Sequence, residues 1–127
     1  MTEPIPLVDF EALRRHVAAY DNLFLMLLNL FLEQAPAWVA ELTEAVASGD
    51  ALLVRQVCHK IKGGAGTLHA KAIIAATEEL SRHAVAGDFV QARASCERLL
   101  SVIEQTTAVV RSFKGVGTGG GQGDRAR

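Results

Sequence analysis

The chain has 127 residues, of which 50% are hydrophobic, so it is long and apolar enough for one domain with one core and is not a wholly disordered protein. Its 13 basic and 14 acidic residues leave a net charge of −1, which argues against nucleic acid or an anionic membrane surface as a partner.

The N-terminus and the longest apolar run indicate where the protein is located. The N-terminus lacks the basic start and apolar core of a signal peptide. The run from Leu23 to Leu32 is about half the length that a membrane-spanning helix needs. We therefore expect a cytoplasmic protein with no membrane segment, in which Cys58 and Cys96 are reduced thiols.

The first part of the chain predicts a short helix followed by a long apolar one. Two prolines keep residues 1–6 extended, and Asp9 can cap a short helix that runs to about Tyr20. A second helix begins near Asp21 and is hydrophobic nearly all round, which predicts a central position in the fold. Pro36 cannot donate a backbone hydrogen bond, so it should kink or divide this helix.

The third helix carries the most informative pattern. Residues at helical spacing predict a buried stripe made of Val54, Val57, Cys58, Ile61 and Ala65. His59 lies off this stripe and should face water, with Arg55, Gly63 and Gly66 on the same outer side and Lys62 at its edge.

Two loops with the same pattern separate the later helices. In Ser48–Asp50 the glycine can end one helix in the left-handed conformation, and the aspartate can cap the next. Ala86–Asp88 repeats this arrangement. The last two helices are therefore expected at about residues 70–85 and 88–113.

These elements define the fold class and the domain organisation. No strand-like alternation competes with the helices, so the sequence predicts an all-α fold. Four main helices with short loops indicate an antiparallel four-helix bundle of up-down-up-down topology, with the short N-terminal helix laid across it. The bundle should span residues 7–113, and the Gly-rich residues 114–127 should form a disordered tail.

The residues around His59 suit a nucleophile that carries a phosphoryl group. A free imidazole is largely neutral at pH 7 and can attack phosphorus through a ring nitrogen. Lys62, three residues on, would stabilise the transferred group as a point charge. A glycine inside a helix costs about 1 kcal/mol relative to alanine, and at Gly63 the close approach of another protein would offset that cost. A plain surface histidine beside a Gly-rich helix end is the alternative.

Several segments resemble one known family. His59–Gly63, read as H-x-x-K-G, resembles the active segment of the histidine-containing phosphotransfer (HPt) domain of bacterial and fungal phosphorelays. Phe31–Pro36, Ala47–Asp50 and Ala86–Asp88 resemble the flanking helix and loop segments at similar distances. The resemblance covers about residues 7–112, and the position of the short motif within this run of helices makes it specific.

The resemblance implies a role for each motif residue. His59 takes the place of the phosphoacceptor, Lys62 that of the charge-compensating lysine, and Gly63 that of the small residue that clears the approach. Such domains shuttle a phosphoryl group between the aspartates of receiver domains, including that of a hybrid sensor histidine kinase. They have no autokinase or phosphatase activity and no cofactor of their own, because the receiver supplies Mg²⁺. We expect a monomer, and the start at Met1 favours a stand-alone protein.

Receiver docking would need an apolar patch beside His59. We hypothesise that Leu13 and Val17 of the first helix form it with Leu23 and Leu27 of the second, because these helices have more apolar surface than one bundle seam requires. A core position for all four residues is the alternative.

Other positions extend or depart from the family pattern. Gln34 resembles a glutamine in the docking surface of some members, and Arg55 and Gly66 share the outer side of the active helix. His69 stands where many members have glycine, so the turn after that helix can differ. Ser81 stands where some have a glutamine that hydrogen-bonds near the imidazole, so that contact can be lost or bridged by water.

Two other functions stay open. A non-catalytic, receiver-binding adaptor of the same fold would carry the same motif, so the sequence hardly separates it from a carrier. A structural or metal-binding bundle is the second alternative. No pair among the four histidines and two cysteines has a familiar metal-ligand spacing, so no metal site is predicted.

Overall fold

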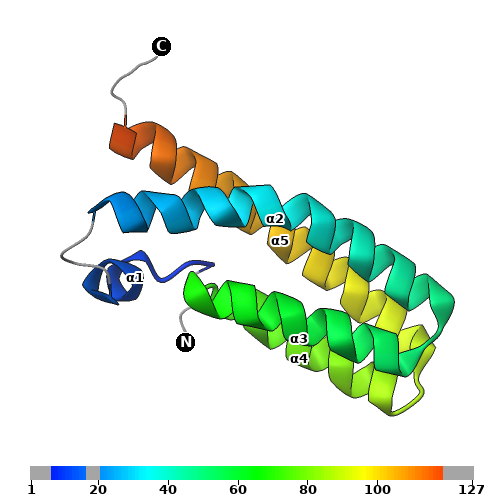
Figure 1. The fold of residues 1–127 in the computed structure, drawn as a ribbon. Helices are drawn as coiled ribbons and strands as arrows, with labels where there is room; N and C mark the ends of the chain where they lie inside the picture. The colour runs from blue at the N-terminus through cyan, green and yellow to red at the C-terminus, as the bar shows by residue number, and fades with distance from the viewer. Residues whose placement is uncertain (1–6, 17–20, 119–127) are drawn as a thin grey trace, which may run out of the picture.

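The computed structural model describes residues 7–16 and 21–118, which form five helices. These are α1 (Phe10–His16), α2 (Asp21–Ser48), α3 (Ala51–Thr67), α4 (Lys71–Val85) and α5 (Phe89–Thr118). The four long helices alternate in direction, and each packs against two neighbours to close a ring in the order α2, α3, α4, α5 (Figure 1). The short α1 lies near the end of the bundle where α2 begins and α3 ends (Figure 1). The predicted all-α antiparallel bundle is confirmed.

Two loops fix where α2 and α4 end and where α3 and α5 begin. Gly49 and Gly87 have φ of +72° and +79°, in the left-handed region where a side chain would add strain. Asp50 and Asp88 each accept a backbone hydrogen bond from the first turn of the following helix, at 3.0 and 3.1 Å. Both predicted caps are therefore present.

α2 continues through Pro36, so of the two predicted effects, a kink or a division of the helix, division does not occur. Pro36 is exposed, and the carbonyl group that it leaves without a helical partner can be hydrated.

Because α2 is continuous, Leu23–Ser48 is long and apolar enough to cross a membrane by length and composition alone. Core helices of soluble proteins pass the same test, and α2 packs against α3 and α5.

The buried face of α3 matches the predicted stripe residue for residue. Val54, Val57, Cys58, Ile61 and Ala65 are all buried.

Burial raises the pKa of the Cys58 thiol to about 12, with a smaller contribution from Cys96. Both cysteines are free and buried. Their thiols therefore stay protonated near neutral pH and act as small apolar core groups.

Short contacts hold α1 against the bundle. The backbone N–H of Asp9 donates to the carbonyl of His69 at 3.0 Å, which ties the start of α1 to the turn between α3 and α4. The ring of Phe10 stacks on that of Phe113, with centroids 4.3 Å apart. Leu13 is only 1% exposed and belongs to the core. A seven-residue helix is not stable alone, so these contacts account for its position.

α5 ends later than predicted, and His69 takes a left-handed backbone conformation in the turn after α3. His69 has a φ of +58°, so the turn after α3 has a shape that glycine would adopt with less strain. α5 extends to Thr118, so residues 114–118 of the predicted tail are helical. Adding residues to an existing helix avoids the nucleation step, which offsets their low propensity. Residues 119–127 lie outside the described part of the chain.

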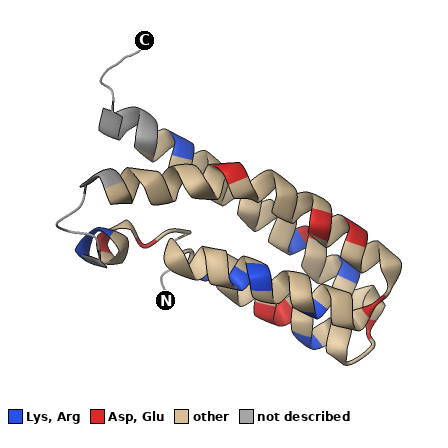
Figure 2. Ribbon diagram, viewed as in Figure 1, with Lys and Arg blue, Asp and Glu red and all other residues tan. Residues whose placement is uncertain are grey.

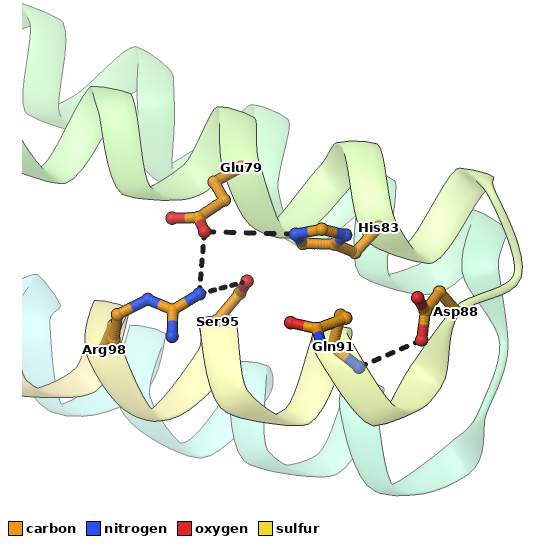
Figure 3. A network of polar contacts seen from close by, with 6 residues as sticks. All are labelled: Glu79, His83, Asp88, Gln91, Ser95 and Arg98. Carbon is orange, nitrogen blue, oxygen red and sulfur yellow. Dashed lines mark hydrogen bonds and ion pairs between the residues drawn. The ribbon is translucent and has the colours of Figure 1, made fainter.

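A polar network joins α4 and α5 on one side of the bundle (Figure 3). Arg98 donates to the carboxylate of Glu79 at 2.7 Å and to the hydroxyl of Ser95 at 3.0 Å. Glu79 thus points toward α5.

Candidate functional site

α3 presents His59 to solvent on the side away from the core. The imidazole is exposed, although the preceding Cys58 is buried, as the predicted helical phase requires. His59 forms no hydrogen bond or ion pair with any described residue. Within residues 7–16 and 21–118, no group of three or more His, Cys, Asp or Glu residues is placed to hold a metal ion. The imidazole of His59 is therefore accessible, and no described side chain holds it.

An open groove of about 970 Å³ lies beside His59 between α3 and α4. Three cations line it, with Arg55 and Lys62 on α3 and Arg82 on α4. Glu78 of α4 lines it as well. Figure 2 shows basic positions on both helices and acidic ones on α4. The groove therefore favours an anion over a cation.

Lys62 is held by Glu78 across the groove. Its Nζ lies 2.9 Å from Oε2 of Glu78, and the two side chains are 48% and 51% exposed. The hydrogen bond and the charge of Lys62 lower the pKa of the Glu78 carboxyl, and Arg82 adds a smaller effect of the same sign. The ammonium group is thus fixed one helical turn from His59, while half of its surface stays open to solvent.

Glu78 and Arg82 were not among the predicted site residues. The short turn between α3 and α4 could have indicated both residues. A turn near residue 69 makes the two helices an antiparallel pair, which places Lys62 opposite the second and third turns of α4. Ser81, which stands in the place of a family glutamine, also lines the groove. Its hydroxyl forms no hydrogen bond to His59 in the described residues.

The three glycines of α3 differ in what surrounds them. A methyl group built on Gly63 or Gly66 would meet no neighbouring atom within 4 Å. A methyl group on Gly64 would lie 2.6 Å from Cζ2 of the Trp38 side chain. Gly64 is therefore required where α3 packs against α2, whereas packing within the domain does not require glycine at Gly63 or Gly66.

The predicted apolar docking patch needs correction. Leu13 is core and is not available on the surface, because it anchors α1 to the bundle. Leu23 and Leu27 are partly buried and pack against the core. Val17 lies outside the described residues. The alternative, a core role, holds for Leu13 and in part for Leu23 and Leu27.

A different pair of apolar side chains is exposed on α2. Met26 is 63% exposed and Leu30 is 45% exposed, and their spacing of four residues puts them on one face. Gln34, one turn after Leu30, is exposed and has its Oε1 3.6 Å from the methyl position of Gly64. This face of α2 therefore borders the exposed side of α3. In a helix that is apolar nearly all round, periodicity cannot tell which apolar residues face out.

Comparison with known proteins identifies the family of this site. The family model of the Hpt domain matches residues 26–112, which include His59, Lys62 and Gly63. The chain belongs to the Hpt domain family. Its fold is similar to the crystal structure of histidine-containing phosphotransfer protein B (HptB) from Pseudomonas aeruginosa PAO1. The TM-score is 0.79 and the sequence identity is 22%, over 87% of this chain and 96% of that one. A search of curated proteins found no match.

Membership of the Hpt domain family gives the class of function. The chain is a histidine phosphotransfer protein of a two-component phosphorelay. Its partners belong to the receiver domains and kinases of such a relay. The family match begins within α2 and ends within α5, so it includes the whole of α3 and α4.

Proposed function

We propose that His59 is the phosphoacceptor and that the protein carries a phosphoryl group between the aspartates of two receiver domains. The observation that supports this is the placement of His59 within an Hpt domain. The imidazole is exposed and has no partner in the described residues. The Lys62 ammonium lies one turn away, and Gly63 leaves the adjacent surface uncovered.

In the proposed reaction, an imidazole nitrogen of His59 attacks the phosphorus of an aspartyl phosphate on the receiver. The N–P bond forms as the bond between phosphorus and the aspartate oxygen breaks, and the aspartate leaves as a carboxylate. The other ring nitrogen keeps the proton. Lys62 balances the added negative charge, and the receiver supplies Mg²⁺. The return step is the same exchange in reverse, so the protein needs no cofactor of its own.

We propose that the receiver docks over both sides of α3. On one side, Met26, Leu30 and Gln34 of α2 offer an apolar surface with a polar edge. On the other side, Arg55 and Arg82 offer positive charge to a receiver site that is acidic because it binds Mg²⁺ through carboxylates. Between these two sides, Gly63 and Gly66 have no side chain that would stand between α3 and the receiver.

The Gly63→Ala variant should have opposite effects on stability and on phosphotransfer. We expect Gly63→Ala to raise the free energy of unfolding by up to about 1 kcal/mol, because alanine favours helix and the methyl group meets nothing. The same variant should slow phosphotransfer, because the methyl group stands where the receiver must approach. Denaturant unfolding and the rate of label transfer measure the two effects.

Gly66→Ala is the matched comparison for Gly63→Ala. Its methyl group also meets nothing, but it lies about 5 Å further along the helix axis, so we expect a smaller loss of transfer. Equal transfer rates for Gly63→Ala and the wild type would contradict close approach of the receiver at this point.

The family match does not favour a receiver-binding adaptor without turnover, and one experiment separates such an adaptor from a carrier. The protein is mixed with a receiver domain carrying labelled phosphate on its aspartate, with Mg²⁺ present. A carrier takes up label that is lost in acid and kept in alkali, as a phosphohistidine should be. Binding of the receiver without movement of label would favour the adaptor.

We further propose that the protein is a cytoplasmic monomer and that its donor is the receiver domain of a hybrid sensor histidine kinase. Membership of the Hpt domain family, whose partners in a phosphorelay are receiver domains and kinases, supports this assignment. Sedimentation that gives twice the mass of the 13.6 kDa chain would contradict the monomer.

A further inference from the structure

Glu78 is an anion in a groove that otherwise carries positive charge. The other side chains of permanent charge that line the groove are Arg55, Lys62 and Arg82. The carboxylate of Glu78 contacts the ammonium of Lys62 at 2.9 Å. That ammonium is the group proposed to balance the phosphoryl group on His59. One lysine therefore faces two anionic ligands once His59 is phosphorylated.

We propose that Glu78 competes with the phosphoryl group for Lys62 and thereby shifts the equilibrium of transfer away from phosphohistidine and toward the receiver. This inference rests on the proposed role of His59 as phosphoacceptor. Glu78 acts through Lys62 and is a positioning residue, because no hydrogen bond or ion pair joins Glu78 to the imidazole of His59.

The charges before and after transfer explain the direction of the effect. Before transfer, Lys62 and Glu78 neutralise each other. A phosphoryl group adds a charge of about −1.5 to −2 near neutral pH. Lys62 must then leave Glu78 or be shared with it, and the carboxylate repels the new group from across the groove. Both effects raise the free energy of the phosphorylated protein, which favours release of the phosphoryl group over its storage.

Glu78 stays ionised under working conditions. Its carboxyl pKa is lowered from 4.5, mainly by the hydrogen bond from Lys62 and by the charge of Lys62. The competition therefore persists at neutral pH. Glu78 and Lys62 are both about half exposed, so solvent limits the size of the effect.

The next residue provides a matched control. Glu79 lies on the same turn of α4 but points toward α5, where Arg98 donates to its carboxylate at 2.7 Å (Figure 3). Glu79→Gln therefore removes the same charge from the same helix turn without touching Lys62. A general effect of net charge would appear in both variants, and competition for Lys62 would appear only in Glu78→Gln.

The test measures the equilibrium between phosphohistidine and the receiver's aspartyl phosphate at fixed Mg²⁺ and ionic strength. We expect Glu78→Gln to shift this ratio toward phosphohistidine by about two- to fivefold, the size of effect typical of a partly exposed ion pair. Glu79→Gln should leave the ratio unchanged. Added salt should reduce the difference between Glu78→Gln and the wild type.

The outcomes separate this inference from the proposed function. Suppose that the wild type takes up label through His59, but Glu78→Gln shifts the ratio of phosphohistidine to aspartyl phosphate no more than Glu79→Gln does. The competition is then refuted, and the carrier function stands. If no label reaches the wild type, both fail. In a Lys62→Ala background, the effect of Glu78→Gln should shrink. An undiminished effect there would show that Glu78 does not act through Lys62.

Discussion

Replacing His59 with glutamine should reduce phosphoryl acceptance from a phosphorylated receiver to background. The amide cannot form the N–P bond, and no other histidine on the described surface combines exposure with a lysine one turn away. The fold should be unaffected, because His59 is exposed and has no partner in the described residues. We expect the free energy of unfolding to change by no more than about 0.5 kcal/mol. Label transfer and denaturant unfolding provide the two readouts.

His83→Gln is the matched control for His59→Gln. His83 is a partly exposed histidine of α4 that lies 3.9 Å from the Glu79 carboxylate and does not line the groove. This variant should take up label at the wild-type rate. Uptake of label by His59→Gln, or its loss in His83→Gln alone, would assign the phosphoryl group to another residue.

Gly64→Ala should cause the largest loss of stability among the glycine variants of α3. The added methyl group would lie 2.6 Å from Cζ2 of Trp38, closer than Cβ atoms approach other atoms in folded proteins, and 3.0 Å from Cη2. The indole is buried and meets the ring of Phe31 edge-on, with centroids 5.6 Å apart, so it has little room to move. Overpacking of this kind costs about 1 to 3 kcal/mol, which outweighs or cancels the helix propensity that alanine gains.

Denaturant unfolding measures this loss, and a smaller residue at Trp38 tests its cause. Trp38→Leu alone should be destabilising, since it removes a buried aromatic ring. Adding Gly64→Ala to Trp38→Leu should then cost less than it costs in the wild type, because the methyl group gains space. Strict additivity of the two changes would mean that Trp38 is not what excludes a side chain at Gly64.

The parts of the fold that sequence could predict are those governed by local rules. The stripe of α3, the Asp50 cap and the left-handed Gly49 each depend on a few neighbouring residues, and each is present in the structure. The same local phase placed His59 on the exposed side. Residue type and spacing left a plain surface histidine open as the alternative, and the resemblance to the HPt domain favoured the phosphoacceptor role of His59.

The parts that sequence could not predict depend on contacts between helices. The close approach of Trp38 to Gly64 and the pairing of Lys62 with Glu78 require the register of one helix against another. Leu27 was predicted to be exposed, but it packs against the core while Leu30 is exposed, because periodicity cannot tell which side of a helix faces out when α2 is apolar on nearly every side. Pro36 was expected to kink or divide α2, and the helix is not divided there, because its exposed position allows the helix to continue.

The most direct test of a carrier role is discharge in a single turnover. The protein is phosphorylated, freed of its donor and mixed with an unphosphorylated receiver domain, with and without Mg²⁺. We predict that label leaves His59 and appears on the receiver's aspartate only when Mg²⁺ is present. Label that stays on the protein with every receiver tried, or that maps to a residue other than His59, would contradict phosphoryl transport through this site.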